Sequence, residues 1–173
     1  MSSHGTHRPL HCYHGGNLYF LTGSTWNRDR LFNDNLKKSL LRDCIFESAD
    51  KYVVNISSWV VLENHYHVEC AVADGKVVPC FIQGIHGRSS KELNDIDGIR
   101  GRKIWYQYWD SFVRGETDYW KRFNYVHQNP VKHGYCSRME QYEFSSYHEY
   151  DRSFLDDCFE KYPIINFVVD NDG

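Results

Sequence analysis

The sequence lacks any apolar run close to the roughly 20 residues that a helix needs to cross a bilayer. Its first residues, MSSHGTHRPLHCYHGG, lack the apolar core of a secretory signal peptide. Six cysteines are present, but no two form a Cys-x-x-Cys pair, which argues against a zinc ribbon and against a disulfide framework. We therefore expect a cytoplasmic protein without membrane association, in which most cysteines are small buried side chains.

An excess of positive charge is also missing from the chain as a whole, which has a formal net charge of -3. The charge is distributed unevenly, however. Residues 151–173 carry six acidic and two basic side chains, whereas residues 97–138 carry eight basic and four acidic ones. The second segment is a candidate surface for phosphate groups of a nucleic acid. Its candidate DNA-binding residues are Arg100, Arg102, Lys103, Lys121 and Arg122.

Length and composition favour one folded domain with flanking segments. The chain has 173 residues, of which 41% are hydrophobic and 16% aromatic, enough for a core of ordinary size. We predict a histidine-rich leader over residues 1–14, whose histidines match no zinc-finger spacing. The main domain is then expected over residues 15–139, followed by a tail over residues 140–173 that is first aromatic and then acidic.

The hydrophobic pattern predicts seven elements in the order strand, helix, strand, strand, helix, strand, helix. In the first helix, Leu36, Leu40 and Cys44 are expected on the buried face, with Asn35 as the N-cap; the last helix is expected to start at a Thr or Asp cap and to end at Pro130. The first six elements match the split βαβ pattern, so we predict an α+β fold: a ferredoxin-like βαββαβ sandwich with an additional C-terminal helix. The seven elements are expected over residues 17–23, 34–51, 52–62, 65–73, 78–93, 104–115 and 117–129.

Two histidines, one residue apart, follow the apolar run SWVVL in the segment NHYHVEC at residues 64–70. Residues i and i+2 of a strand project from the same face, so His65 and His67 should lie side by side and Tyr66 should point the other way. Such a pair is able to hold a metal ion. The alternative is a pair of surface histidines without a ligand.

The last predicted helix offers a partner for this pair. Tyr119, Phe123 and Val126 form its buried stripe, while Tyr125 and Asn129 share a different face. The amide oxygen of Asn129 would complete a site of two imidazoles and one oxygen, a set that accepts Mg²⁺ or Mn²⁺. Tyr125 would then be a nucleophile toward a phosphate, although tyrosine also occurs at such positions for packing alone.

Four segments, taken in order, resemble the REP-associated tyrosine transposases, relatives of the transposases of small insertion sequences in the HUH single-strand nuclease superfamily. The resemblance spans roughly residues 15–150. Its most specific parts are the His-x-His after WVVL and the block Tyr-x-x-x-Asn-Pro-Val-Lys-His-Gly. The segments are WVVLENHYHV, IWYQYWDSFVRGETDY, YVHQNPVKHG and YEFSSYHEY.

The resemblance implies specific roles for four residues. The metal-binding histidines of the family correspond to His65 and His67, its nucleophile to Tyr125 and its amide ligand to Asn129. The family acts on single-stranded DNA that bears hairpins from repetitive extragenic palindromes, uses Mg²⁺ or Mn²⁺, and forms a 5′-phosphotyrosine intermediate. We expect a monomer or a homodimer.

Two other functions remain open at this stage. A replication or relaxation initiator of the same superfamily would use the same chemistry on another target, but the short chain and the NPVKHG block disfavour it. A domesticated hairpin-binding protein would keep the DNA interaction without cleavage. The presence of His65, His67, Tyr125 and Asn129 favours an enzyme over this second alternative.

Overall fold

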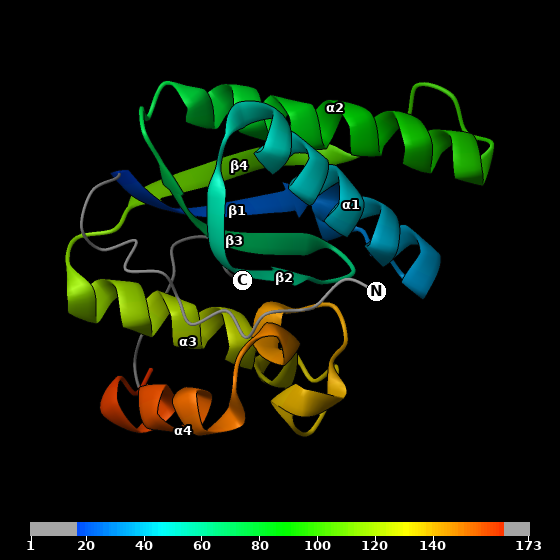
Figure 1. The fold of residues 1–173 in the computed structure, drawn as a ribbon. Coiled ribbons are helices and arrows are strands. Elements are labelled where there is room, and N and C mark those ends of the chain that lie inside the picture. The colour runs from blue at the N-terminus through cyan, green and yellow to red at the C-terminus, as the bar shows by residue number, and fades with distance from the viewer. Residues whose placement is uncertain (1–16, 165–173) are drawn as a thin grey trace, which may run out of the picture.

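The computed structural model describes residues 17–164, which form a four-stranded antiparallel sheet with helices on both of its faces (Figure 1). The strands lie in the order β2-β3-β1-β4. In chain order the elements are β1 (Asn17–Thr25), the 3-10 turn η2 (Trp26–Arg28), α1 (Asn35–Tyr52), β2 (Asn55–Val61), β3 (His65–Val72), α2 (Val77–Asp97), β4 (Trp105–Phe112), α3 (Glu116–Lys132), the 3-10 turns η3 (Met139–Gln141) and η4 (Ser146–Glu149), and α4 (Arg152–Lys161).

The topology confirms the predicted βαββαβ sandwich. β3 pairs with both β1 and β2, and β4 pairs with β1, so the hairpin of β2 and β3 sits at one edge of the sheet and β4 at the other. α1 and α2 pack together on one face. α3 packs on the other face against β2 and β3, and α4 packs on α3 (Figure 1). The additional helix is therefore separated from α1 and α2 by the sheet.

The first helix differs from the prediction in its cap and in its buried stripe. Asp34, not Asn35, is the N-cap, and its side chain accepts a hydrogen bond from the backbone N–H of Lys37. Leu36 is 65% exposed, because the buried stripe is centred between Leu40 and Leu41, and a rotation of about 100° per residue leaves Leu36 outside it. The buried residues of α1 are Lys38, Leu40, Leu41, Cys44, Ile45, Ser48 and Ala49.

The last predicted helix extends further than expected in both directions. α3 starts after Gly115, which has a φ of 104° and serves as the N-cap, so the predicted Thr or Asp cap is wrong. Pro130 lies inside the helix, which continues to Lys132. The proline removes one N–H donor, but the backbone N–H of His133 still donates to the carbonyl of Asn129 at 3.0 Å, and that of Tyr135 donates to the carbonyl of Pro130 at 2.9 Å. The helical turn after the proline is thereby retained.

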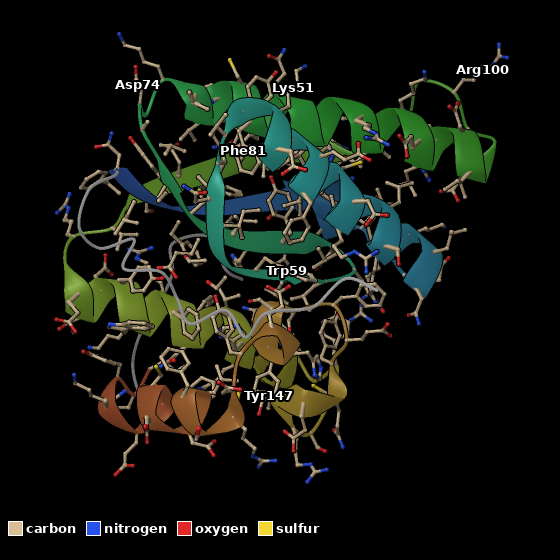
Figure 2. All side chains as sticks on the ribbon, viewed as in Figure 1. Lys51, Trp59, Asp74, Phe81, Arg100 and Tyr147 are labelled. Atoms are coloured by element: carbon tan, nitrogen blue, oxygen red, sulfur yellow. The ribbon has the colours of Figure 1, made fainter. Side chains whose placement is uncertain are left out.

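The beginning of the predicted tail wraps around the α3 side of the domain. The hydroxyl of Tyr142 donates to the carbonyl of Val61 at 2.8 Å, and Ser146 Oγ accepts from the backbone N–H of Trp59 at 3.0 Å. Figure 2 shows Tyr147 in this lower layer, on the side of the sheet opposite α2. The segment up to residue 164 thus closes the outer side of α3.

Two expectations about composition can be compared with the described residues. Three of the five free cysteines there, Cys44, Cys70 and Cys158, are buried, as expected for small apolar side chains. Within residues 17–164, no helix combines the length and the apolar character needed to cross a membrane. The predicted leader lies outside the described residues, and the predicted domain boundaries stay a prediction.

Candidate active site

His65 and His67 project from β3 toward α3, the face predicted for a shared site. Their ring centroids are 5.1 Å apart. Tyr66, between them, points to the α2 side, where its hydroxyl lies 3.1 Å from His86 Nε2. The expected alternation is therefore confirmed. The alternative of surface histidines does not hold, since α3 covers this face and leaves His65 2% and His67 0% exposed.

Each of the two imidazoles is oriented through its Nδ1 atom. Thr22 Oγ1 lies 2.8 Å from Nδ1 of His67, and Asn64 Oδ1 lies 2.7 Å from Nδ1 of His65. Asn64 in turn donates from Nδ2 to the carbonyl of Arg28 at 3.2 Å, which fixes its amide so that Oδ1 faces the histidine. A histidine that binds a metal is commonly held in this way, by a polar partner on its other ring nitrogen.

The amide of Asn129 lies directly against His65. Its Oδ1 is 3.3 Å from His65 Nε2. In a neutral ring whose Nδ1 donates to Asn64, Nε2 is an acceptor, so two acceptor atoms face each other. Asn129 is 0% exposed, and its Nδ2 has no hydrogen-bond partner among the described residues. A cation held by both acceptors would relieve this arrangement.

Burial favours the neutral form of His65. Burial lowers the pKa of His65 well below its usual value, and the charges of His67, His133 and Arg28 act in the same direction. A neutral imidazole is the form that binds a metal. Among the described residues, no three His, Cys, Asp or Glu side chains form a possible ligand group. The ligand set of His65, His67 and the amide of Asn129 stays a prediction.

His133 and Arg28 are two neighbours of this site that the sequence analysis missed. The ring of His133 lies 5.0 Å from that of His65, and its pKa is lowered to about 4, first by burial and then by the charge of Lys132. Its position four residues after Asn129 was the available signal, because such residues share a helix face. The turn η2 brings Arg28 close to His65, and no pattern in the sequence indicated that proximity.

Tyr125 comes from one turn before Asn129 on the same face of α3, as predicted. It is 1% exposed, and its ring centroid lies 5.5 Å from that of His67 and 6.3 Å from that of Phe20. Its hydroxyl accepts a hydrogen bond from Lys132 Nζ at 3.1 Å. Burial lowers the pKa of Lys132 from its usual value.

A pocket of about 560 Å³ opens beside this tyrosine, between the end of α3, η3 and the start of α4. A volume of this order is sufficient for a small organic ligand or one nucleotide. Three basic side chains, Lys132, Arg138 and Arg152, line the pocket together with Tyr125. The remaining lining residues are Gln128, Asn129, Val131, Ser137, Met139, Glu140 and Ile164.

His127 lies on the other side of α3 from Tyr125, because two residues along a helix are separated by a rotation of about 200°. Its Nε2 is 2.8 Å from Ser146 Oγ, and its ring packs against that of Phe123 at 4.5 Å. Tyr119, Phe123 and Val126, the predicted core stripe, are all buried. α3 is thus enclosed on two sides, and the tyrosine that faces the histidines is separated from the side chains that hold α4.

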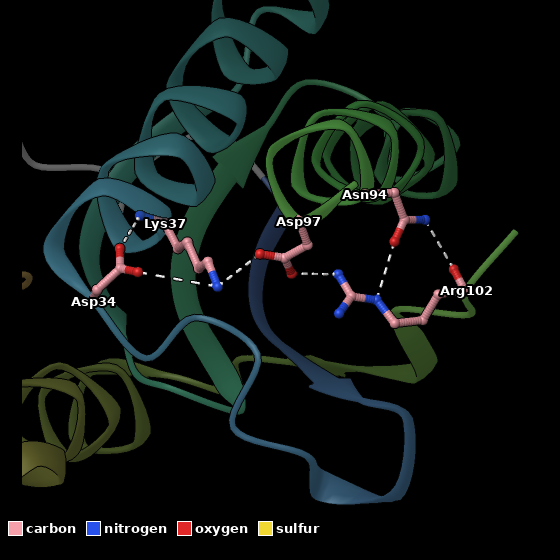
Figure 3. A network of polar contacts seen from close by, with 5 residues as sticks. All are labelled: Asp34, Lys37, Asn94, Asp97 and Arg102. Atoms are coloured by element: carbon pink, nitrogen blue, oxygen red, sulfur yellow. Dashed lines mark hydrogen bonds and ion pairs between the residues drawn. The ribbon is translucent and has the colours of Figure 1, made fainter. Parts of the chain in front are cut away.

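The structure does not gather the five basic candidates into one surface. Arg102 donates from Nε to Asn94 Oδ1 at 3.0 Å and pairs with Asp97 at 2.7 Å, and Asp97 also binds Lys37, so the guanidinium joins a network between α1 and α2 (Figure 3). Arg100 lies beyond the end of α2, far from α3 (Figure 2). Lys121 and Arg122 belong to α3, across the sheet. Their roles toward DNA stay a prediction.

The chain is similar to known transposases over most of its length. The family described as "Transposase IS200 like" matches residues 18–129. A REP-associated tyrosine transposase of Escherichia coli is 26% identical over 141 residues, which cover 75% of this chain and 80% of that protein. A protein of Haemophilus influenzae, provisionally named a REP-associated tyrosine transposase, is 35% identical over 144 residues, covering 77% and 81%.

A solved structure agrees with these relatives. It is that of a REP-associated tyrosine transposase bound to a REP hairpin, which superposes with a TM-score of 0.63 and 26% identity over 86% of this chain and 84% of that one. The matched residues include β3 with its two histidines and α3 up to Asn129. This chain belongs to the family of IS200-like transposases and, within it, to the REP-associated tyrosine transposases.

Proposed function

We propose that this protein is a metal-dependent transesterase that cuts and rejoins single-stranded DNA at REP-type hairpins. One observation carries the proposal: the ring of Tyr125 packs 5.5 Å from that of His67, at the site where Asn129 and His65 face each other at 3.3 Å. A phenol oxygen beside a neutral donor set suits phosphoryl transfer. The REP hairpin in the related structure supports the choice of substrate.

Tyr125 is the nucleophile in this proposal. Its phenol oxygen attacks phosphorus, a new P–O bond forms, and the bond from phosphorus to the 3′ oxygen breaks. The phenol gives up its proton and the departing 3′ oxygen takes one up, so the products are a 5′-phosphotyrosine and a free 3′-hydroxyl. The number of phosphodiester bonds is conserved, so a 3′-hydroxyl attacks the phosphotyrosine in the reverse direction and rejoins the strand without ATP.

His65, His67 and Asn129 are the proposed ligands of Mg²⁺ or Mn²⁺. The oxygen of Asn129 suits either ion, and the two imidazoles favour Mn²⁺. When held there, such an ion would supply positive charge that polarises the attacked phosphate. Thr22 and Asn64 hold the two rings in register for this role, through the contacts at 2.8 and 2.7 Å.

Lys132 is the proposed electrostatic partner of Tyr125. Its ammonium donates to the phenol oxygen, and this would stabilise the negative charge on that oxygen when the phenol loses its proton before the attack and again when the phosphotyrosine is resolved. A lysine whose pKa burial has lowered is also able to release and regain protons near neutral pH more readily than an exposed one.

A labelled DNA hairpin with a single-stranded 5′ flank, incubated with the protein and Mn²⁺, tests the proposal. We expect a covalent protein–DNA adduct on a denaturing gel and a free 3′-hydroxyl on the released strand. Chelation of the divalent ion should abolish the adduct. A shifted band on a native gel without any adduct would mean that the protein binds hairpins and does not cut them.

A further inference from the structure

A group of partly exposed aromatic rings lies at the edge of the sheet, outside the site described above. Trp26 of η2 and Tyr106 of β4 have ring centroids 5.4 Å apart, and Tyr106 lies 6.4 Å from Trp109. Lys103 Nζ is 3.5 Å above the ring of Trp26. Tyr106 is 53% exposed. We call Trp26, Lys103, Tyr106 and Trp109 the aromatic shelf.

The strand register places the shelf beside the candidate active site. Thr22 of β1 pairs with His67 on one side and with Trp109 on the other, so the three residues form one row across the sheet. Directly paired residues of antiparallel strands point to the same face. Trp109 and His67 therefore share the α3 face, and two strand spacings put their Cα atoms roughly 10 Å apart.

On the α3 face, α3 covers β2 and β3, and among residues 17–164 it has no comparable packing against β4. α3 packs against β2 and β3, whereas the main contacts of β4 are with β1, η2 and α2. Asp110, the acidic residue of β4, pairs with Leu21 and so belongs to the opposite face. The shelf thus combines exposed rings with the cation of Lys103.

The turn η2 joins the shelf to the active site. It begins with Trp26 and ends with Arg28, whose carbonyl accepts a hydrogen bond from Asn64, the side chain that contacts Nδ1 of His65. Asn27 and Arg28 both have positive φ, 54° and 59°, a backbone conformation that non-glycine residues rarely adopt. Within three residues, this backbone leads from the tilted rings of the shelf to the side chain that holds His65.

We propose that the aromatic shelf binds unpaired bases of the single-stranded flank that leads from the hairpin to Tyr125. Aromatic rings next to a cation are the features by which proteins bind single strands, because every base stacks on a ring and every phosphate attracts the cation. The shelf would also orient the flank toward the metal ligands. This proposal rests on the proposed function for the identity of the DNA, but it concerns binding alone.

The test compares two probes and two matched variants without any divalent ion. The probes are a hairpin with a single-stranded flank and the same hairpin with blunt ends. Tyr106→Ala removes a shelf ring, and Phe112→Ala is its control, because Phe112 is 50% exposed on the same strand but packs against Tyr19 at the far end. We expect Tyr106→Ala to bind the flanked hairpin about 5- to 150-fold more weakly and the blunt hairpin unchanged. Phe112→Ala should bind both as the wild type does.

Photocrosslinking gives a second measurement that does not depend on the stability of a variant. A flank carrying 5-iodouracil should crosslink to Trp26, Tyr106 or Trp109, identified by peptide mass. Crosslinks confined to other residues, or equal losses for flanked and blunt hairpins, would overturn the proposal. So would self-association that Tyr106→Ala abolishes while DNA binding stays unchanged, since the shelf would then be an interface between two copies of the chain.

The two proposals fail in different ways. If the wild type forms no adduct with Mn²⁺, yet Tyr106→Ala loses binding to the flanked hairpin, cleavage is contradicted and the proposal about the shelf stands. A protein that forms the adduct, while Tyr106→Ala binds the flanked hairpin as the wild type does and the flank crosslinks only outside the shelf, would contradict the shelf and leave the proposed enzyme activity standing.

Discussion

Lys132 Nζ donates a hydrogen bond to the hydroxyl of Tyr125 at 3.1 Å, across two turns of α3. It also lies 4.9 Å from the centre of the tyrosine ring. The contact exists because α3 continues through Pro130, the residue at which the helix was predicted to end. A helix that ended before the proline would have left the tyrosine without this cation.

Replacing Lys132 tests whether this contact acts in the chemistry. Lys132→Met keeps most of the side-chain length and removes the charge, so we expect adduct formation to slow by about 100-fold, the usual cost of losing one stabilising donor. The wild-type rate should also fall at high pH, as the ammonium deprotonates, and Lys132→Met should lack that fall. Stopped reactions with the flanked hairpin across pH measure both effects. Lys132→Arg, which keeps a positive charge, is the control, and an unchanged rate in Lys132→Met would assign the lysine to packing.

Tyr125→Phe should abolish the adduct and little else. The substitution deletes the attacking oxygen and keeps the ring that packs against His67 and Phe20. Losing the hydrogen bond from Lys132 should cost about 0.5–1.5 kcal/mol of unfolding free energy. Binding of Mn²⁺ and of the hairpin should persist. Tyr119→Phe is the matched control, because Tyr119 is also buried but packs against Trp120 on the core stripe, and it should still form the adduct. An adduct that survives Tyr125→Phe would overturn the mechanism.

Much of this arrangement was predictable from periodicity, and the rest was not. Alternation along a strand placed His65 beside His67, and helical spacing placed Tyr125 with Asn129, because both patterns depend only on local backbone geometry. The burial of the histidines depends on how α3 crosses the sheet. That crossing is a tertiary contact, and no local pattern determined it.

The residues that the sequence analysis missed also reach the site only through tertiary contacts. Arg28 reaches the site through a turn with two positive φ values, and His133 through a helix that passes a proline. Arg102 depends on tertiary contacts too: its charge predicts phosphate binding, the fold joins it to Asp97, and its role toward DNA stays a prediction. A sequence shows which charges exist, whereas partners that are distant along the chain decide what the charges contact.

Metal binding should depend on His67 and, more weakly, on Thr22, which orients the His67 ring. His67 is fully buried against Phe20, so His67→Ala would leave a cavity, and His67→Phe is the better variant because it retains a ring. We expect calorimetry to show no Mn²⁺ binding by His67→Phe. Thr22→Val removes the contact at 2.8 Å to Nδ1 and should weaken binding about 10- to 100-fold. Mn²⁺ binding that is the same in His67→Phe as in the wild type would show that the ligand assignment is wrong.

We expect Arg102 to contribute mainly to the stability of the fold and Lys103 mainly to DNA binding. Arg102→Gln breaks the ion pair with Asp97 and the bond to Asn94, which ought to lower the unfolding free energy by about 1 kcal/mol. Lys103→Gln removes the cation above Trp26 and should flatten the dependence of DNA affinity on salt by about 0.7–0.9 in log–log slope. Urea unfolding and titrations at several salt concentrations measure the two effects. The opposite pattern, with the salt slope changed by Arg102→Gln alone, would restore Arg102 as a phosphate contact.

His86 should make the fold sensitive to acid. Its ring stacks on Trp105 at 4.3 Å, Tyr66 and Tyr108 also face it, and burial lowers its pKa from 6.5 to about 3. Below pH 6.5, His86 therefore binds a proton in the unfolded chain. In the folded chain it stays neutral until the pH falls to about 3. Stability is fully present above pH 6.5 and falls as the pH drops toward 3, with a slope that approaches about 1.4 kcal/mol per pH unit.

His86→Phe should remove this contribution, because a phenyl ring keeps the stack on Trp105 and cannot take up a proton. We expect the variant to lose about 1 kcal/mol at pH 7, where the contact with the Tyr66 hydroxyl is missing. Its stability should then depend less steeply on pH between 6.5 and 4 than that of the wild type, and the two curves should approach each other or cross. Urea unfolding at half-unit steps of pH measures both slopes. Parallel curves for the two proteins would mean that His86 binds its proton equally well in the folded and unfolded chains.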